Sequence, residues 1–219
     1  VGLGDIVDHA KTLTTLNSIW KYDYTTDTGA YRKVFTAGRW YAMDGEGGLI
    51  MCTFPHGGED TLKKGNTGFS AYDNECWTGS EHEIVTTMMW EGEVDKALAE
   101  ERAINDRYNG AVRNPWDECE CGSHYSRALS SYGVFAAACG FEYDGPKQTM
   151  AFAPRIHPED FQAAFLAAQG WGSFSQKADG GALNAKLDLR HGSLDLKQLA
   201  LVLPAGAAGS TVKATIGGK

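Results

Sequence analysis

Apolar residues recur at every third or fourth position in five stretches of this 219-residue chain, and this spacing constrains the fold most. Such a repeat places the apolar side chains along one face of a helix. It predicts amphipathic helices over about 5–18, 80–91, 94–104, 123–139 and 158–168. Ser80 and Glu83 are expected to form a capping box at the start of the second helix, and Gly140 is expected to end the fourth.

Two other regions are typical of β-structure. Residues 31–54 contain short apolar runs with a turn near Asp44-Gly45, and residues 182–203 alternate Leu with other residues. His191-Gly192-Ser193 is expected to be a hairpin turn between two strands of the second region. We therefore expect a mainly α protein with a strand insertion and a β-rich C-terminal segment.

The composition excludes several classes of protein. A hydrophobic content of 42% with 22% charged residues is typical of a globular protein and not of a disordered one. The net charge of −8 argues against a nucleic-acid partner, because phosphate recognition needs an excess of Lys and Arg. No apolar run approaches the roughly 18 residues of a membrane span, so we expect no transmembrane segment.

The charge is unevenly distributed along the chain. Residues 1–145 carry 12 basic and 23 acidic side chains, whereas residues 146–219 carry 8 and 5. We expect a soft boundary near Asp144-Gly145-Pro146, with helical hairpins over 1–145 and a closing helix and β-rich segment of the same domain over 146–219. The chain opens on Val1 and shows no basic-then-apolar leader of a signal peptide. It also lacks an initiator Met, from which we expect a cleaved, trimmed or partial product.

The five cysteines are an odd number, which is unusual for a secreted disulfide scaffold. Reduced and mostly buried thiols are the expected state, and they favour a reducing compartment such as the cytoplasm. The alternative is a zinc site from Cys119, Cys121 and His124, for which a fourth ligand has no obvious candidate. Asp73, Glu75, Asp117 and Glu120 are oxygen donors for Ca²⁺ without the spacing of a calcium loop, so this ion is left unassigned and we expect no cofactor.

The densest group of chemically active residues lies between Arg113 and Arg127. Trp116, Glu118, His124 and Arg127 fall here, in a loop that is expected to lead into a helix. Carboxylates accept hydrogen bonds from sugar hydroxyls, a guanidinium donates to them, and an aromatic face packs on the C–H surface of a sugar ring. The alternative is an internal salt-bridge network at the start of the helix.

A second group precedes the helix that is expected at 80–91. Glu81 and His82 remain available for a ligand if Glu83 is occupied by the capping box. The alternative is that these first-turn acids stabilise the helix dipole.

Several motifs resemble glycoside hydrolase family 116, which includes bacterial β-glucosidases and non-lysosomal glucosylceramidases. The central one is Asn114-Pro115-Trp116-Asp117-Glu118 followed by Glu120-Cys121-Gly122-Ser123-His124-Tyr125-Ser126-Arg127. Further matches occur in the same order at residues 77–81, 140–146, 152–155 and 170–176. The resemblance implies the C-terminal part of an (α/α)6 barrel, of which this chain holds the last few helical hairpins, and retaining hydrolysis of a β-glycoside or glycolipid.

The resemblance also implies roles for individual residues. Glu118 and Arg127 match a Glu and an Arg that hold sugar hydroxyls, and Glu81 matches another sugar-contacting acid. Both catalytic carboxylates of the family lie upstream of the matching stretch, so no residue here is assigned as nucleophile or acid. The implied partner is an upstream catalytic segment or companion chain. A non-catalytic carbohydrate-binding module and a purely structural fragment remain alternatives.

Overall fold

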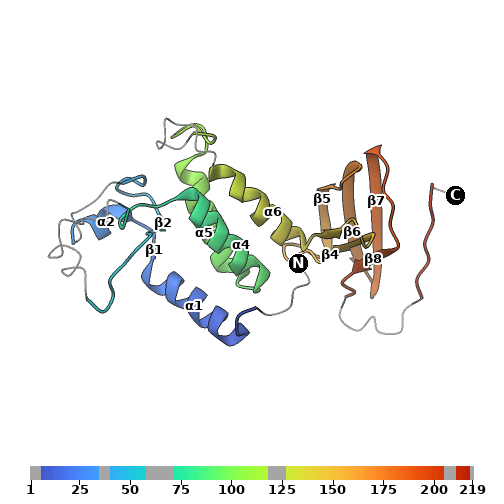
Figure 1. Ribbon diagram of the computed structural model, residues 1–219, viewed down its shortest axis with the longest axis horizontal. Helices are drawn as coiled ribbons and strands as arrows, with labels where there is room; N and C mark the ends of the chain where they lie inside the picture. The colour runs from blue at the N-terminus through green and yellow to red at the C-terminus, as the bar shows by residue number, and fades with distance from the viewer. Residues whose placement is uncertain (1–5, 35–39, 58–71, 118–126, 205–210, 218–219) are drawn as a thin grey trace. The chain divides into compact units, whose positions relative to one another are not determined.

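The computed structural model describes residues 6–34, 40–57, 72–117, 127–204 and 211–217. The chain divides into two compact units, unit 1 (Val1–Ala137) and unit 2 (Ala138–Lys219) (Figure 1). The division falls inside helix α6 (Ser131–Cys139). The turn at Asp144-Gly145-Pro146, where the sequence predicts the change to a β-rich segment, connects two strands of unit 2.

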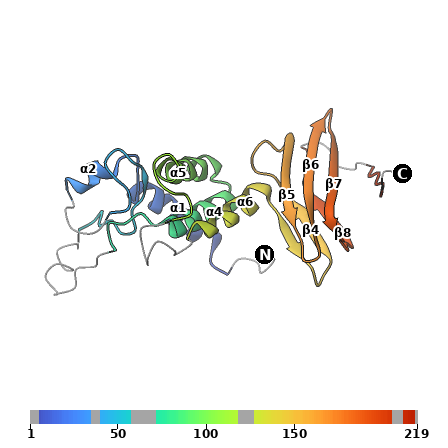
Figure 2. The same ribbon diagram turned by 90° about the horizontal axis from the view of Figure 1, so that it is seen from above.

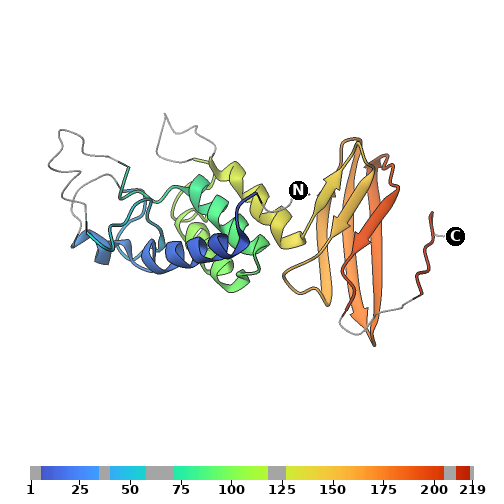
Figure 3. The ribbon, with the colours of Figure 1, turned by 60° about the horizontal axis from the view of Figure 1, so that its bottom comes forward.

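Unit 1 is built around a helical hairpin of α4 (Thr78–Trp90) and α5 (Val94–Arg107). Gly92 makes the turn between them with a φ of 86°, a conformation that suits a residue without a Cβ. Helix α1 (His9–Tyr22) lies along this pair, and its Asn17 accepts a hydrogen bond of 2.6 Å from Lys96 of α5 (Figure 3). The hairpin buries Val85, Met88, Met89, Ala97 and Ile104.

The remaining elements of unit 1 are short. Helix α2 (Thr28–Arg32) follows β1 (Tyr24–Thr25), which pairs in antiparallel fashion with β2 (Gly48–Leu49). A single 3₁₀ turn, η2 (Arg127–Ser130), precedes α6. No helix in the described part of the chain combines the length and the apolar content that a bilayer crossing requires.

Unit 2 contains two three-stranded sheets. The first has the order β3 (Glu142–Asp144), β4 (Thr149–Phe152) and β8 (Gln198–Leu201), and β8 runs parallel to β4. The second is an antiparallel meander of β5 (Asp160–Leu166), β6 (Gly170–Asp179) and β7 (Ala182–Gly192) (Figure 2). Phe152 of the first sheet stacks on Phe174 of the second with ring centroids 3.9 Å apart, so the core of unit 2 lies between the sheets.

The expected fold class is wrong. The described residues form five α-helices and eight strands in three small sheets, which is a mixed α/β structure. It is neither mainly α nor the C-terminal part of an (α/α)6 barrel. The reason is that the C-terminal third satisfies its backbone hydrogen bonds by strand pairing, and the described residues of unit 1 contain one long helical hairpin rather than a ring of them.

The closing helix expected at 158–168 is a strand, β5. Its apolar residues fit two periods: Phe161, Ala164 and Phe165 suit a helix, and Phe161, Ala163 and Phe165 suit a strand. Pairing with β6 settles the choice, because Phe161, Ala163 and Phe165 lie opposite the inward-facing Gln176, Phe174 and Gly172.

Other predicted elements also differ in detail. Helix α4 begins at Thr78, so Ser80 lies inside the helix and forms no capping box. The strands expected within 31–54 reduce to β2, and the helix expected at 123–139 begins as η2 in its described part. His191-Gly192-Ser193 is not a hairpin turn, because β7 pairs with β6 whereas β8 pairs with β4.

Replacement of Phe174 by Ala should destabilise unit 2, because the ring is fully buried between the two sheets. We expect a loss of about 3–5 kcal/mol, measured as faster hydrogen exchange of the β6 amides. The matched control is Leu166→Ala, since Leu166 is 71% exposed on the same sheet. Equal exchange in the two variants would contradict a core at this position.

Candidate functional site

A pocket of about 410 Å³ opens in unit 1 between the α4–α5 hairpin and the segment that begins α6. Polypeptide from four places forms its wall: the start of α4, the C-terminal half of α5, the loop at 115–117, and η2 with the start of α6. The side chains that line it are Thr78, His82, Glu101, Ile104, Asn105, Tyr108, Pro115, Trp116, Asp117, Arg127, Ala128, Leu129, Ser131 and Tyr132. Its size falls within the range of small-molecule sites.

Trp116 and Asp117 reach the pocket because a tight turn holds the loop that carries them. The Asn114 side chain accepts a hydrogen bond from the Trp116 backbone N–H at 3.1 Å, and Asn114 O accepts from Asp117 N–H at 3.3 Å. Side-chain capping of this kind is how Asn stabilises turns. The turn leaves the Trp116 side chain 80% exposed, and Asp117 Oδ1 is buried without a hydrogen-bond partner among the described residues.

The Arg127 side chain packs against Trp77 and Gly79, at the start of α4. Its guanidinium carbon lies 4.4 Å from the centre of the Trp77 ring, which is a cation–π distance. Gly79 leaves room for this arrangement, since a Cβ there would lie 3.2 Å from the Cβ of Arg127. The structure therefore brings the Trp77-Thr78-Gly79 motif next to Arg127, although the two are far apart in sequence.

Helices α4 and α5 each contribute an ionisable group to the pocket. His82 Nδ1 lies 3.0 Å from Glu101 Oε2, and the His82 side chain is almost fully buried. Asn105 follows Glu101 by one helical turn and lines the same wall. This pairing orients the imidazole and occupies one oxygen of Glu101.

Glu81 does not line the pocket. It is 1% exposed and forms an ion pair with Arg107 in the interior of unit 1. Its second oxygen accepts a hydrogen bond of 3.0 Å from the Leu49 backbone N–H, and Arg107 also donates to Gly47 O at 2.6 Å. In this structure Glu81 joins α4, α5 and the 47–49 segment, so a sugar contact by Glu81 has no support from its position.

Glu100 is a second carboxyl group in this interior, next to Glu81 and Arg107. Burial raises the pKa of Glu100 well above its ordinary value of 4.5, and repulsion from Glu81 raises it further. Burial alone would lower the pKa of Arg107, but Glu81 and the other nearby acidic groups raise it above its usual value. The raised pKa favours the uncharged form of Glu100 beside the Glu81–Arg107 ion pair.

Of the five residues that the sequence nominates for sugar binding, Trp116 and Arg127 line the pocket and Glu81 does not. Glu118 and His124 lie in 118–126, outside the described residues, as do Cys119 and Cys121 of the possible zinc site. Asp117 and Arg127, which flank that stretch, both line the pocket. Within the described part of the chain, no three His, Cys, Asp or Glu side chains are grouped as a metal site would need.

Sequence reasoning missed Glu101, Asn105, Tyr108 and Tyr132 as pocket residues. Glu101 and Asn105 carry a usable signal, because their spacing of four places two polar side chains on one face of α5. Tyr132 is more surprising, since it belongs to the apolar stripe that the sequence predicts along the 123–139 helix, namely Tyr125, Ala128, Leu129, Tyr132, Phe135 and Ala136. Leu129, Tyr132 and Phe135 of that stripe are all exposed, and α6 buries Val134 and Ala137 instead.

No model of a protein family matches the chain, and no curated protein matches it.

Glu81→Gln should strongly destabilise unit 1, because it leaves the buried Arg107 guanidinium without its charged partner. We expect a loss of about 3–5 kcal/mol in the free energy of unfolding, measured with urea. Glu83→Gln is the matched control: Glu83 lies on the same helix but is exposed, so its change should stay within about 0.5 kcal/mol. Similar losses in both variants would show that the Glu81–Arg107 pair is not important for stability.

Glu100 should make stability depend on pH. Because its pKa is higher in the folded than in the unfolded protein, its contribution is fully present below about pH 4.5 and is lost as the pH rises through the folded value. Glu100→Gln carries an uncharged side chain that resembles the protonated acid, so its free energy of unfolding should not show this decrease as the pH rises. Urea unfolding of both proteins between acidic and mildly alkaline pH tests this. Parallel pH profiles would exclude a raised pKa for Glu100.

Proposed function

We propose that the pocket of unit 1 binds the sugar ring of a β-glycoside, and that the chain supplies the sugar-binding wall of a retaining β-glycoside hydrolase resembling β-glucosidases and glucosylceramidases. One observation carries the proposal: three aromatic rings and an Arg, an Asp and a His–Glu pair line a single cavity of about 410 Å³. A sugar needs this combination, because its hydroxyls donate and accept while its C–H faces are apolar. Its motifs also resemble those of the hydrolase family.

Each side of the pocket supplies a different kind of contact. The exposed Trp116 ring offers a flat apolar face for the C–H surface of a sugar. The Arg127 guanidinium, which lies over the Trp77 ring, donates hydrogen bonds to the sugar hydroxyls. The Asp117 carboxylate accepts hydrogen bonds from other hydroxyls of the sugar. Glu118 and His124 belong to the same proposal through the resemblance, since the chain between Asp117 and Arg127 contains them.

Retaining hydrolysis needs two carboxyl groups about 5–5.5 Å apart, one as nucleophile and one as general acid and base. The neighbouring carboxyl groups Glu81 and Glu100 are not suited to this task, because both are buried around Arg107 away from the pocket lining. We therefore propose that an upstream segment or companion chain supplies the catalytic pair.

Non-catalytic carbohydrate binding is the second candidate. The carboxylates of the pocket favour it. Glu101 pairs with His82, and Asp117 is the carboxylate outside an ion pair among the described lining residues. A chromogenic β-glucoside distinguishes the two candidates. Turnover by this chain, or by this chain with its companion, supports the hydrolase, and binding without turnover in both settings supports the second candidate.

Arg127→Ala should weaken binding of methyl β-D-glucopyranoside roughly 10- to 150-fold, which corresponds to the about 1.5–3 kcal/mol of a charge-assisted hydrogen bond. Isothermal titration calorimetry of the full chain measures the affinity. Arg102→Ala is the matched control, because Arg102 is exposed, pairs with Asp106 and does not line the pocket. The proposal is wrong if wild type and the Arg127 variant bind every tested glycoside equally well.

A further inference from the structure

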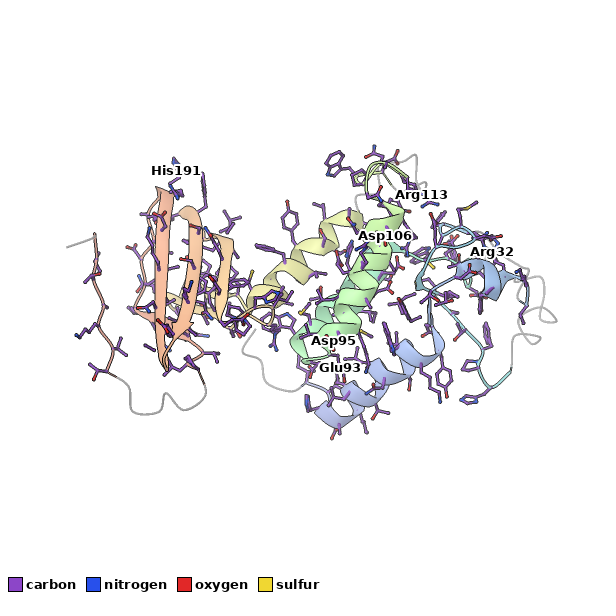
Figure 4. The ribbon with its side chains drawn as sticks, turned by 180° about the vertical axis from the view of Figure 1, so that it is seen from behind. Arg32, Glu93, Asp95, Asp106, Arg113 and His191 are labelled. Atoms are coloured by element: carbon purple, nitrogen blue, oxygen red, sulfur yellow. The ribbon has the colours of Figure 1, made fainter. Side chains whose placement is uncertain are left out.

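The outer face of the β5–β6–β7 sheet carries an aromatic group that the core of unit 2 does not use. Trp171 of β6 lies opposite Leu166 of β5 and His191 of β7, and it is 51% exposed. The indole and imidazole rings are nearly parallel, at 27°, with centroids 6.3 Å apart. His191 lies at the end of the sheet where β7 ends (Figure 4), and Trp171 is its partner in β6.

A β-bulge puts His191 on this face. Regular alternation along β7 would turn Arg190 outward and His191 inward, but the register shifts between Trp171 and Gly172 by one residue. His191 therefore pairs with the outward-facing Trp171. Arg190 remains on the same face, since it forms a 2.9 Å ion pair with Asp188, which lies opposite the outward-facing Ser173.

The glycines on both sides of Trp171 permit this bulge. A Cβ at Gly172 would collide with the Asp188 carbonyl oxygen, and a Cβ at Gly170 would lie 2.7 Å from the carbonyl oxygens of His191 and Ser193. The Gly170-Trp171-Gly172 sequence thus combines one large exposed ring with two positions where β7 can approach closely. Bulges that re-aim side chains are common next to functional sites.

We propose that Trp171, Asp188, Arg190 and His191 form a second carbohydrate site, which binds a hexopyranose unit of a β-linked oligosaccharide. The exposed indole face packs against the C–H surface of the ring. Asp188 accepts hydrogen bonds from sugar hydroxyls, and Arg190 and His191 donate to them from beside the indole. Ser173, which lies opposite Asp188, keeps the neighbouring surface small and polar.

The charges on this face favour a neutral sugar over a nucleic acid. Asp188 neutralises Arg190 and lies 3.7 Å from Lys186, while Asp160 pairs with Lys177 further along the sheet. Phosphate backbones bind where Lys and Arg are in excess and unpaired. The chain as a whole carries a charge of −8, which opposes such a ligand further.

This site does not depend on the pocket of unit 1, because the two share no residue and belong to different units. Its failure would leave the proposed function untouched. The reverse also holds, since a platform on unit 2 can hold a glycan whether or not the pocket of unit 1 binds the same molecule.

Titration of the full ¹⁵N-labelled chain with cellopentaose tests the site by nuclear magnetic resonance. Trp171 is the only Trp after residue 137, so its indole N–H resonance can be assigned by its loss in Trp171→Ala. We expect cellopentaose to shift this resonance and the β6 and β7 amides. In Trp171→Ala the amide shifts should need at least roughly tenfold more sugar. The control Phe135→Ala, which removes an exposed ring outside both sites, should leave them as in wild type.

Arg190→Gln provides a second variant, because it changes an exposed side chain and should keep the fold; we expect several-fold weaker binding. Three results would overturn the proposal: no shift of the β6 and β7 amides with cellopentaose, equal affinity in wild type and a folded Trp171→Ala protein, or stronger shifts of the same amides with an oligothymidylate.

Discussion

The buried ion pair between Arg107 and Glu81 is the interaction on which unit 1 depends. It joins the end of α5 to the first turn of α4, and further hydrogen bonds from Leu49 N–H and to Gly47 O tie in the strand segment. Buried charges are costly unless they are paired and their remaining hydrogen bonds are satisfied. The first turn of α4, the end of α5 and the 47–49 segment therefore have to pack together at one place. A Cβ at Gly48 would collide there with the side chains of Arg107 and Glu81.

The pocket is assembled on the same pair of helices. Helix α4 presents His82 and α5 presents Glu101 from positions directly after Glu81 and Glu100, so the interior cluster and the pocket wall lie on adjacent faces. Glu81 and Arg107 pair in the interior, whereas His82 and Glu101 pair in the pocket wall. Trp77, just before α4, holds Arg127 by a cation–π contact.

Unit 2 follows a different constraint, in which each strand of the β5–β6–β7 sheet has one face for the core and one for solvent. Phe165, Phe174 and Leu187 pack inward against Phe152 of the other sheet. The bulge in β7 breaks this alternation at a single place and brings His191 to the outer face beside Trp171 and Arg190. Both units thus present an exposed Trp ring beside charged side chains.

Local pattern alone was enough to locate the helices α1 and α5 and the β-rich character of the C-terminal third, and it singled out Trp116 and Arg127, which line the pocket. It was not enough for β5, where helical and strand periods fit the same apolar residues and only pairing with β6 chooses between them. Nor could it separate Glu81 from the pocket, since the partner that buries it, Arg107, is 26 residues away. The spacing of apolar residues indicates which face of an element is apolar. Only the packing of segments that are distant in sequence determines which residues that face contacts, and therefore which charged groups are buried in ion pairs.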